Sequence, residues 1–133
     1  MKVPMFVLRR LKEKNMPEYL PDKLAEITIK MLGDRWKVLI IQNLLEGTKR
    51  FGELKRELGN ITQKVLTSNL RLLEEKGILI RKVYAQIPPR VDYTLTQLGY
   101  ELKPVIDSMI AWAEEYRRNV AKALNIKLPD LVS

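Results

Sequence analysis

The chain has 133 residues, of which 46% are hydrophobic and 30% charged, with a formal net charge of +8; this composition predicts one globular domain that can bury a core. Neither cysteine nor histidine occurs, which excludes disulfides, Cys/His zinc sites and the usual nucleophile–histidine pairs of enzymes. No apolar run approaches the ~20 residues of a membrane-spanning helix and no signal-peptide pattern is found, so we expect a cytoplasmic protein.

The first predicted elements are helices. Residues 1–21 form an N-terminal extension, in which a short helix is predicted on Met5, Phe6, Leu8 and Leu11. Pro21 suits the first turn of a second helix, which runs to Leu32. The apolar face of this second helix consists of Leu24, Ile27 and Met31. Asp34 then caps a third helix, predicted over residues 35–46, whose apolar side chains occupy most of its circumference.

Two helices joined by a tight turn follow. The first is predicted over residues 51–58, and Gly59 opens the turn that follows it. Thr62 suits the N-cap of the second helix, predicted over residues 62–76. Two helices connected in this way predict a helix-turn-helix.

After the helix-turn-helix, the apolar pattern changes from a helical period to strict alternation. Residues 79–84 and 91–96 alternate and are rich in β-branched and aromatic side chains, as strands are. Pro88 and Pro89 stiffen the loop between them. We therefore predict a β-hairpin, called the wing below, over residues 79–95.

The last predicted helix begins after the N-cap Thr96 and runs to Tyr116, with a kink expected at Pro104. Residues 117–133 are predicted to form a C-terminal tail. This order of elements predicts a single domain over residues 1–133 that is mainly α with a small β-hairpin, a winged helix-turn-helix.

The second helix of the motif has two chemically distinct faces. Leu66, Leu70 and Leu73 recur at helical spacing and are predicted to face the core. The opposite face carries the side-chain types that contact base edges and phosphates. These candidate DNA-binding residues are Thr62, Gln63, Lys64, Thr67, Ser68 and Arg71. In a winged helix this helix enters the major groove; an ordinary solvated surface is the alternative.

Basic residues are concentrated in one part of the chain. Residues 48–90 hold ten basic and four acidic side chains, so ten minus four gives +6 of the total of +8. This concentration favours a polyanion, either nucleic acid or an acidic membrane surface. Predicted backbone contacts near the first helix of the motif are Lys49, Arg50, Lys55 and Arg56. At the wing, Pro88, Pro89 and Arg90 are predicted to contact the minor groove or phosphates, because a stiffened loop loses little entropy on binding.

Several segments, in order, resemble HxlR-type winged-helix regulators. The segment Arg50-Phe51-Gly52-Glu53-Leu54 resembles that family's RFxEL. The segment Ile61-Thr62-Gln63-Lys64-Val65-Leu66-Thr67 resembles ISQKVLT, and residues 88–96, PPRVDYTLT, resemble PPRVEYSLT. Further similarity is found in residues 33–41 and 70–74, in Leu98-Gly99 and at Trp112. The resemblance covers roughly residues 22–116.

The resemblance implies a homodimer that binds an inverted repeat of double-stranded DNA, with recognition helices roughly 34–36 Å apart. It places the dimer interface on the helix before Trp36 and on the last helix. The residues concerned are Leu24, Ile27, Met31, Ile106, Met109, Trp112 and Tyr116. Wide apolar stripes on both helices favour an interface independently, although completion of the monomer core is the alternative. Many members sense thiol stress through a cysteine near the position of Asp22, and its absence here excludes that mechanism.

The same residues leave other functions to consider. A winged helix can also be a protein–protein scaffold, which steep salt dependence of DNA binding would distinguish. An enzyme is disfavoured because adjacent carboxylates such as Glu74-Glu75 point to different sides of a helix, and no cofactor or metal is predicted. A small-molecule effector pocket formed by Trp36, Met109, Trp112 and Tyr116 stays open. We expect a cytoplasmic, nucleoid-associated, DNA-binding transcription regulator.

Overall fold

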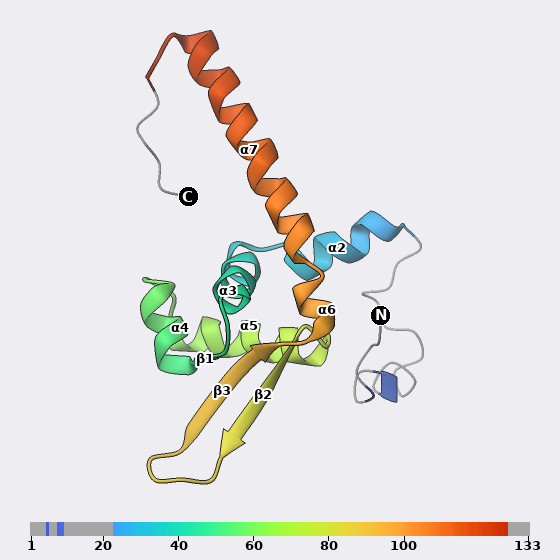
Figure 1. The fold of residues 1–133 in the computed structure, drawn as a ribbon, viewed down its shortest axis with the longest axis vertical. Helices are drawn as coiled ribbons and strands as arrows, with labels where there is room; N and C mark the ends of the chain where they lie inside the picture. Colours follow the sequence, from blue (N-terminus) through green and yellow to red (C-terminus); the bar gives the residue numbers. More distant parts are fainter. Residues whose placement is uncertain (1–4, 6–7, 10–22, 128–133) are drawn as a thin grey trace.

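A computed structural model of the chain describes residues 5, 8–9 and 23–127 (Figure 1). The elements in chain order are α2 (Leu24–Leu32), α3 (Arg35–Leu45), β1 (Lys49–Arg50), α4 (Phe51–Glu57), α5 (Gln63–Glu75), β2 (Leu79–Tyr84), β3 (Arg90–Leu95), α6 (Gln97–Tyr100) and α7 (Lys103–Leu124). The three strands form one antiparallel sheet in the order β1-β3-β2. The fold is the predicted mainly helical winged helix-turn-helix. No helix within the described ranges is long and apolar enough to cross a bilayer.

The helix-turn-helix lies where the sequence predicts it. Thr62 caps α5 by accepting a hydrogen bond at Oγ1 from the backbone N–H of Val65, at 3.1 Å. Gly77 follows α5 with φ of +77°, a conformation that glycine adopts without strain. The hairpin also has the predicted bounds, with Leu79 paired to Leu95 and Tyr84 paired to Arg90.

Two features differ from the predicted elements. The two-residue strand β1 was not predicted, and it pairs with β3 so that Lys49 lies opposite Tyr93. The last helix is divided into α6 and α7, and Pro104 lies in the first turn of α7, where a missing N–H costs no hydrogen bond. Helix α7 then continues past Tyr116 to Leu124, so residues 117–124 are helix and not tail.

The structure describes only part of the N-terminal region in which two helices are predicted. Helix α2 begins at Leu24 after the N-cap Lys23, later than predicted, and Pro21 lies outside the described residues. Of the predicted short helix near the N-terminus, Met5 and Leu8 are described and helical, whereas Phe6 and Leu11 are not described. The described fold therefore rests on residues 23–127.

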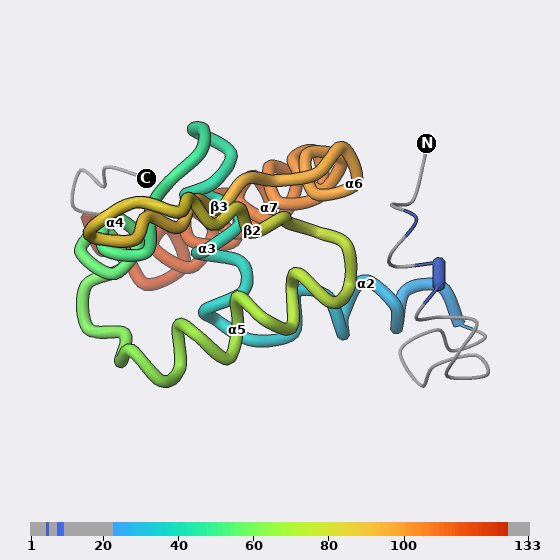
Figure 2. Tube along the Cα trace, turned by 90° about the horizontal axis from the view of Figure 1, so that it is seen from below, coloured from blue at the N-terminus to red at the C-terminus, as the bar shows by residue number. Residues whose placement is uncertain are grey.

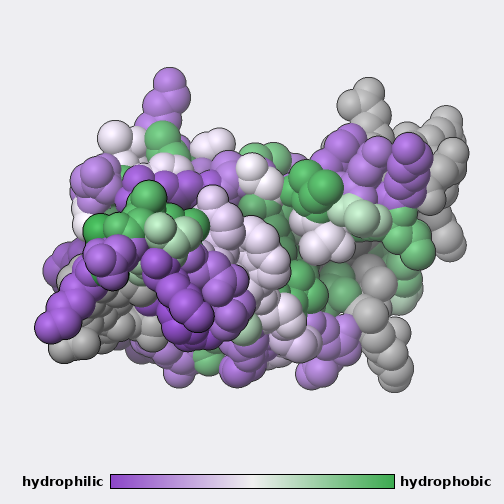
Figure 3. All heavy atoms as spheres, turned by 90° about the horizontal axis from the view of Figure 1, so that it is seen from above, coloured by the Kyte–Doolittle hydropathy of each residue, from purple (hydrophilic) through white to green (hydrophobic). Residues whose placement is uncertain are grey.

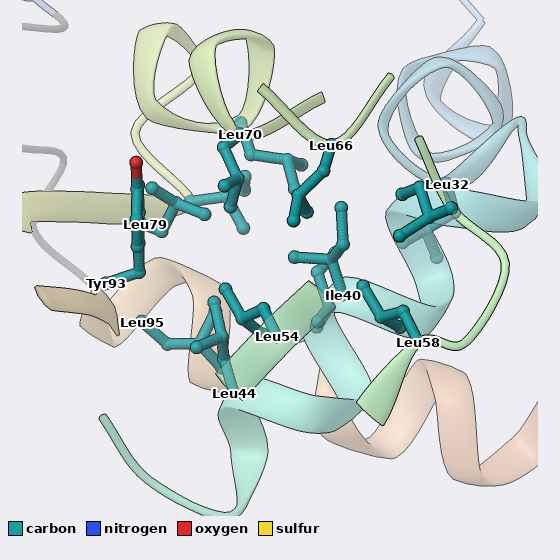
Figure 4. Close-up of a cluster of buried hydrophobic side chains, with 14 of the residues drawn as sticks. Leu32, Ile40, Leu44, Leu54, Leu58, Leu66, Leu70, Leu79, Tyr93 and Leu95 are labelled. Carbon is teal, nitrogen blue, oxygen red and sulfur yellow. The ribbon is translucent and has the colours of Figure 1, made fainter. Parts of the chain in front are cut away.

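The core lies between α3, α5 and the sheet (Figure 4). Leu66 and Leu70 of α5 point toward Ile40 of α3 and toward Leu79 of β2, and all four are at most 2% exposed. Burial of large aliphatic side chains stabilises each by about 1.5–3 kcal/mol. This packing fixes how α5 is rotated about its axis, and so determines which of its side chains face solvent.

Gly99 joins the wing to the helices that follow it. A Cβ at this position would lie 2.2 Å from the carbonyl oxygen of Ile78, so only glycine fits this close approach. Thr96 closes the same joint, because its Oγ1 accepts from the Gly99 N–H at 3.1 Å and donates to the Gly77 carbonyl at 2.5 Å, with the Ile78 carbonyl 3.1 Å away. The direction in which α6 and α7 leave the sheet is therefore set by backbone contacts.

Candidate nucleic-acid interface

The outward side of α5 gathers the predicted DNA-binding residues. Because Leu66, Leu70 and Leu73 are buried, the opposite side of the helix is exposed along one edge of the molecule (Figure 2). A shallow hollow of about 700 Å³ there is lined by Gln63, Lys64, Thr67, Ser68, Arg71 and Leu72. Five of the six candidates thus share one surface, called the α5 face below. The sixth, Thr62, is exposed but uses its hydroxyl to cap the helix.

Arg81 is a basic neighbour of the α5 face that sequence reasoning missed. A second small hollow, of about 120 Å³, places it beside Thr67, Arg71 and Glu74. Arg81 pairs with Tyr93 across the sheet, so it lies on the sheet face that Tyr93 turns toward the core. The alternation of the strand places Arg81 on the same face as the apolar Leu79, but only the packing of β2 against α5 brings Arg81 beside Arg71. Among the described residues, Lys64, Arg71 and Arg81 form no ion pair, which leaves their charges available.

Lys49 is the clearest correction to the predicted DNA contacts. Its side chain is 7% exposed, and its Nζ donates to Asn43 at 3.1 Å, to Glu46 at 2.7 Å and to Glu57. Burial opposes the ammonium charge, but the hydrogen bonds with the two carboxylates outweigh it and raise the pKa of Lys49. All three ammonium donors are used inside the fold. Lys49 therefore links α3, β1 and α4 and is not available to a phosphate.

Arg90 is held at the base of the wing tip. Its Nε and Nη2 donate to the two carboxylate oxygens of Asp92 at 3.0 and 2.9 Å, a bidentate pair. This hydrogen bonding lowers the pKa of Asp92 and raises the pKa of Arg90. The guanidinium also lies over the ring of Tyr84, 4.6 Å from its centroid. Arg90 is thus a positioned charge on β3, and the loop itself spans residues 85–89.

The remaining predicted contacts divide between the wing and α4. Pro88 and Pro89 are exposed and, with Arg50 and Arg90, line a hollow of about 270 Å³ between the wing and the start of α4. Ile87 at the tip is fully exposed. Lys55 is half-buried and Arg56 is exposed on α4, and neither lines this hollow or that of the α5 face.

The predicted dimer residues separate into two groups. Met109 and Trp112 of α7 are exposed, as are Tyr116 and, on α2, Leu24. Ile27 and Met31 are half-buried. Ile106 is 1% exposed and belongs to the core of the monomer, so its prediction as an interface residue was wrong. Ile106 lies on the side of α7 that faces the core, whereas Val105 and Met109 are exposed.

The predicted effector pocket is only partly assembled. Met109 and Trp112 line an open hollow of about 770 Å³ with Pro104, Val105 and Ser108, but Trp36 packs against the core instead. No group of three or more acidic side chains that could hold a metal ion occurs among the described residues. The surface features are therefore a polar, basic face on α5 and an apolar face on α7.

Comparison with known proteins connects this arrangement to one family. The model of the HxlR-like helix-turn-helix family matches residues 31–121. The HTH-type transcriptional regulator YdeP of Bacillus subtilis is 42% identical over 74% of this chain and 77% of its own length. The solved structure of the HTH-type transcriptional regulator ytcD is 43% identical, with a TM-score of 0.69 over 72% of this chain and 98% of its own. That of the redox regulator HypR in its reduced form is 39% identical, with a TM-score of 0.70 over 75% and 99%.

Proposed function

Because the chain belongs to the HxlR-like helix-turn-helix family, whose members are transcriptional regulators that bind DNA, we propose that it recognises a specific DNA site through the α5 face. Helix α5 would lie in the major groove, where each base pair presents a distinct pattern of donors and acceptors. The wing, residues 79–95, would contact the flanking minor groove and backbone. The protein would act in the cytoplasm, on the nucleoid.

The observation that carries this proposal is the composition of the α5 face. It brings three amide- or hydroxyl-bearing side chains and two cations into one hollow: Gln63, Thr67, Ser68, Lys64 and Arg71, with Leu72 at its edge. Arginine and glutamine make bidentate contacts with guanine and adenine, and threonine can contact the thymine methyl group. A scaffold surface needs no such concentration of unpaired donors.

In this proposal, three arginines contact the DNA backbone: Arg50, Arg81 and Arg90. Arg50 lies between the wing and α4, and Arg81 lies beside Arg71. Arg90 is pre-positioned by Asp92, which lowers the entropic cost of using it. The exposed Ile87 gives the wing an apolar tip of the kind that contacts sugar edges in a minor groove.

We also propose that two copies bind an inverted repeat. The exposed apolar residues of α7 give the monomer a surface that a second copy would cover. Two-fold symmetry then requires half-sites whose centres are about 10–10.5 base pairs apart, or a multiple of this. HypR is named as a redox regulator, but a thiol switch has no residue to act on in these 133 residues.

The experiment is selection of bound sequences from a random duplex pool by the full chain. The proposal predicts enrichment of an inverted repeat and a steep decrease of affinity with salt. Arg71→Ala should weaken binding to the selected site by roughly 10-fold or more and relax the preference at one base pair of each half-site. Absence of any enriched sequence, together with affinity that ignores salt, would support a protein–protein scaffold instead.

Lys103→Ala is the matched control. It removes one positive charge, as Arg71→Ala does, from an exposed residue of α7 whose ammonium pairs with Asp107 at 2.6 Å. Equal losses in the two variants would mean that net charge alone drives binding and that the α5 face does not read sequence.

A further inference from the structure

The outward face of the sheet carries a buried carboxylate among cations. Asp92 lies on the central strand β3 and is only 6% exposed. It is directly opposite Arg50 of β1 on one side and Lys82 of β2 on the other. Side chains of directly opposite residues project from the same face of a sheet, as do those of residues two apart on one strand. Arg90 therefore shares this face with Asp92 and its two cross-strand neighbours.

Arg90 is held in one orientation by contacts on this face. Its Nε and Nη2 donate to the two carboxylate oxygens of Asp92 at 3.0 and 2.9 Å. Its guanidinium lies 4.6 Å from the centroid of the Tyr84 ring, and the ammonium of Lys82 lies 5.0 Å from the same centroid. Two parallel hydrogen bonds fix the plane of a guanidinium as well as its position. Arg90 therefore has less conformational freedom than an ordinary exposed arginine.

The cations around Asp92 keep it ionised and leave the face positive. Hydrogen bonds from Arg90, together with the charges of Arg50 and Lys82, outweigh the effect of burial and hold the pKa of Asp92 below 3.8. Three cations and one carboxylate give three minus one, a net charge of +2. Asp92 is buried, whereas Arg50 and Lys82 are exposed, so the part of this face that meets solvent is basic.

Arg90 and Arg50 converge on one hollow between the wing and the start of α4. This hollow of about 270 Å³ is lined by both arginines, with Gly52 and the two prolines of the wing. The pair with Asp92 uses two of the five N–H donors of Arg90, so three are left for another acceptor. Guanidinium groups match the geometry of phosphate oxygens. The hollow is therefore suited to a phosphate group.

We propose that Asp92 is a positioning residue for DNA binding, which holds Arg90 at this hollow so that Arg90 and Arg50 together bind one phosphate of the DNA backbone. Without its carboxylate partner, the guanidinium would have to be ordered at the moment of binding, at the entropic cost of immobilising a long side chain. This inference rests on the DNA binding of the proposed function and gives an acidic residue a role in it.

The substitution Asp92→Asn distinguishes positioning from simple charge, because the two predict opposite signs. Asparagine keeps the size of aspartate but places an amide donor where the carboxylate accepts, so the two-bond pair with Arg90 is lost. If Asp92 only reduces the positive charge of the wing, its removal should tighten DNA binding. If it positions Arg90, binding should weaken by roughly 3–10-fold even though the chain gains a positive charge. Phosphate contacts carry no sequence information, so we expect this loss on a selected site and on a scrambled duplex alike.

Asp107→Asn is the matched control. It makes the same chemical change at an exposed residue of α7, whose carboxylate pairs with Lys103 at 2.6 Å. The wing and α7 extend toward opposite ends of the molecule (Figure 1), and Figure 3 views the α7 end, where hydrophilic and hydrophobic residues are interspersed. Titrations at about 150 mM salt keep the effect of a distant charge small, because the Debye length is then about 8 Å. The control should bind both duplexes as tightly as the native chain or more tightly, and an Asp92→Asn variant that does the same would overturn the proposal.

The effect of Asp92→Asn should also depend on Arg90. In a chain that already carries Arg90→Ala, there is no guanidinium to position, so Asp92→Asn should no longer weaken DNA binding. Equal losses with and without Arg90 would overturn the proposal, because Asp92 would then act through the fold of the wing.

One measurement needs neither DNA nor a change at Asp92. Nitrogen-15 relaxation of the arginine side chains in the full native chain should show the Nε–H of Arg90 to be more ordered than that of Arg56, which is exposed on α4. Equal mobility of the two would overturn positioning even if Asp92→Asn did not fold. A native chain that binds no duplex would overturn the proposed function and this role with it, whereas a chain that binds DNA and is not weakened by Asp92→Asn would overturn this role alone.

Discussion

Helices α5 and α7 are both amphipathic, but they present opposite faces to solvent. The leucines of α5 are buried in the monomer, and its polar and basic side chains are exposed. In α7, Ile106 is buried while Trp112 and Tyr116 on the other side are exposed. A polar exposed face suits a hydrated polyanion, whereas an apolar exposed face suits another protein surface. In our proposal, the same fold therefore separates DNA recognition and self-association onto two helices.

The largest effect should come from breaking the apolar face of α7. Trp112→Asp places a charge in the proposed interface, so we expect a monomer and a loss of roughly 100-fold or more in affinity for an inverted repeat, because the two half-sites no longer bind together. Thermal unfolding of the monomer should change little, since Trp112 is largely exposed. Light scattering and DNA titration measure both, and a variant that stays dimeric would contradict this role.

The next largest effect is expected at Gly99, which connects the wing to the helices α6 and α7. Gly99→Ala places a Cβ against the Ile78 carbonyl, so the free energy of unfolding should fall by about 1–3 kcal/mol. Chemical denaturation measures this decrease. Unchanged stability would mean that the backbone between the wing and α7 adjusts freely and does not fix their relative direction.

A substitution at Arg81 tests whether the DNA-binding surface extends from the α5 face to β2. Arg81→Ala should weaken DNA binding by roughly 5–10-fold and reduce the magnitude of the log–log salt slope by about 0.9, the value for one phosphate contact. Its matched control is Lys103→Ala, which removes one positive charge from an exposed residue of α7 outside the proposed DNA contacts. Equal effects from the two substitutions would remove Arg81 from the interface.

A substitution at Lys49 tests whether this lysine stabilises the fold without contacting DNA. Lys49→Met should lower the free energy of unfolding by about 1–2 kcal/mol and leave the salt slope of DNA binding unchanged. Because folding raises the pKa of Lys49 above 10.5, its contribution is present below that pH and is lost as the pH rises through the raised value. The difference in free energy of unfolding between the native chain and Lys49→Met should therefore be smaller above pH 11 than at pH 8, as chemical denaturation measures. A salt slope that is reduced by the substitution would instead identify Lys49 as a phosphate contact.

The smallest effect concerns α3, which packs against both α5 and α7. Burial opposes the charge of the Asp34 carboxylate, but hydrogen bonds from Lys37 outweigh it and lower the pKa of Asp34 below 3.8. Its charge therefore stabilises the fold above that pH, and this contribution is lost as the pH falls through the lower folded value. Asp34→Asn should cost about 0.5 kcal/mol at pH 7 and progressively less as the pH is lowered below 3.8, as measured by urea unfolding.

The α5 face could be predicted because local signals agree. Thr62 and Gly77 mark the ends of the helix, and the spacing of Leu66, Leu70 and Leu73 determines which side is buried. Once that side is fixed, the polar residues on the other side follow from helix geometry alone. The hairpin was equally accessible, because alternation and proline placement are local properties.

Residues whose environment depends on distant segments were not predictable in this way. Lys49 is buried where β1 pairs with β3, and two residues are too short to form a strand pattern. Ile106 and Met109 are both apolar residues of the same helical pattern, but only Ile106 is buried, because the packing of α7 against the rest of the fold decides which side meets the core. Arg81 was missed because it comes close to Arg71 only through the packing of β2 against α5.

The most direct test of DNA recognition by the α5 face is the salt dependence of duplex binding by the native chain and by Arg71→Ala. The native chain should lose affinity steeply as salt rises, with a log–log slope of about −0.9 for each phosphate it neutralises. Arg71→Ala should bind more weakly at every salt concentration, because Arg71 is one of the two cations of the α5 face. A native affinity that does not change with salt, or an Arg71→Ala variant that binds as well as the native chain, would contradict DNA recognition by α5.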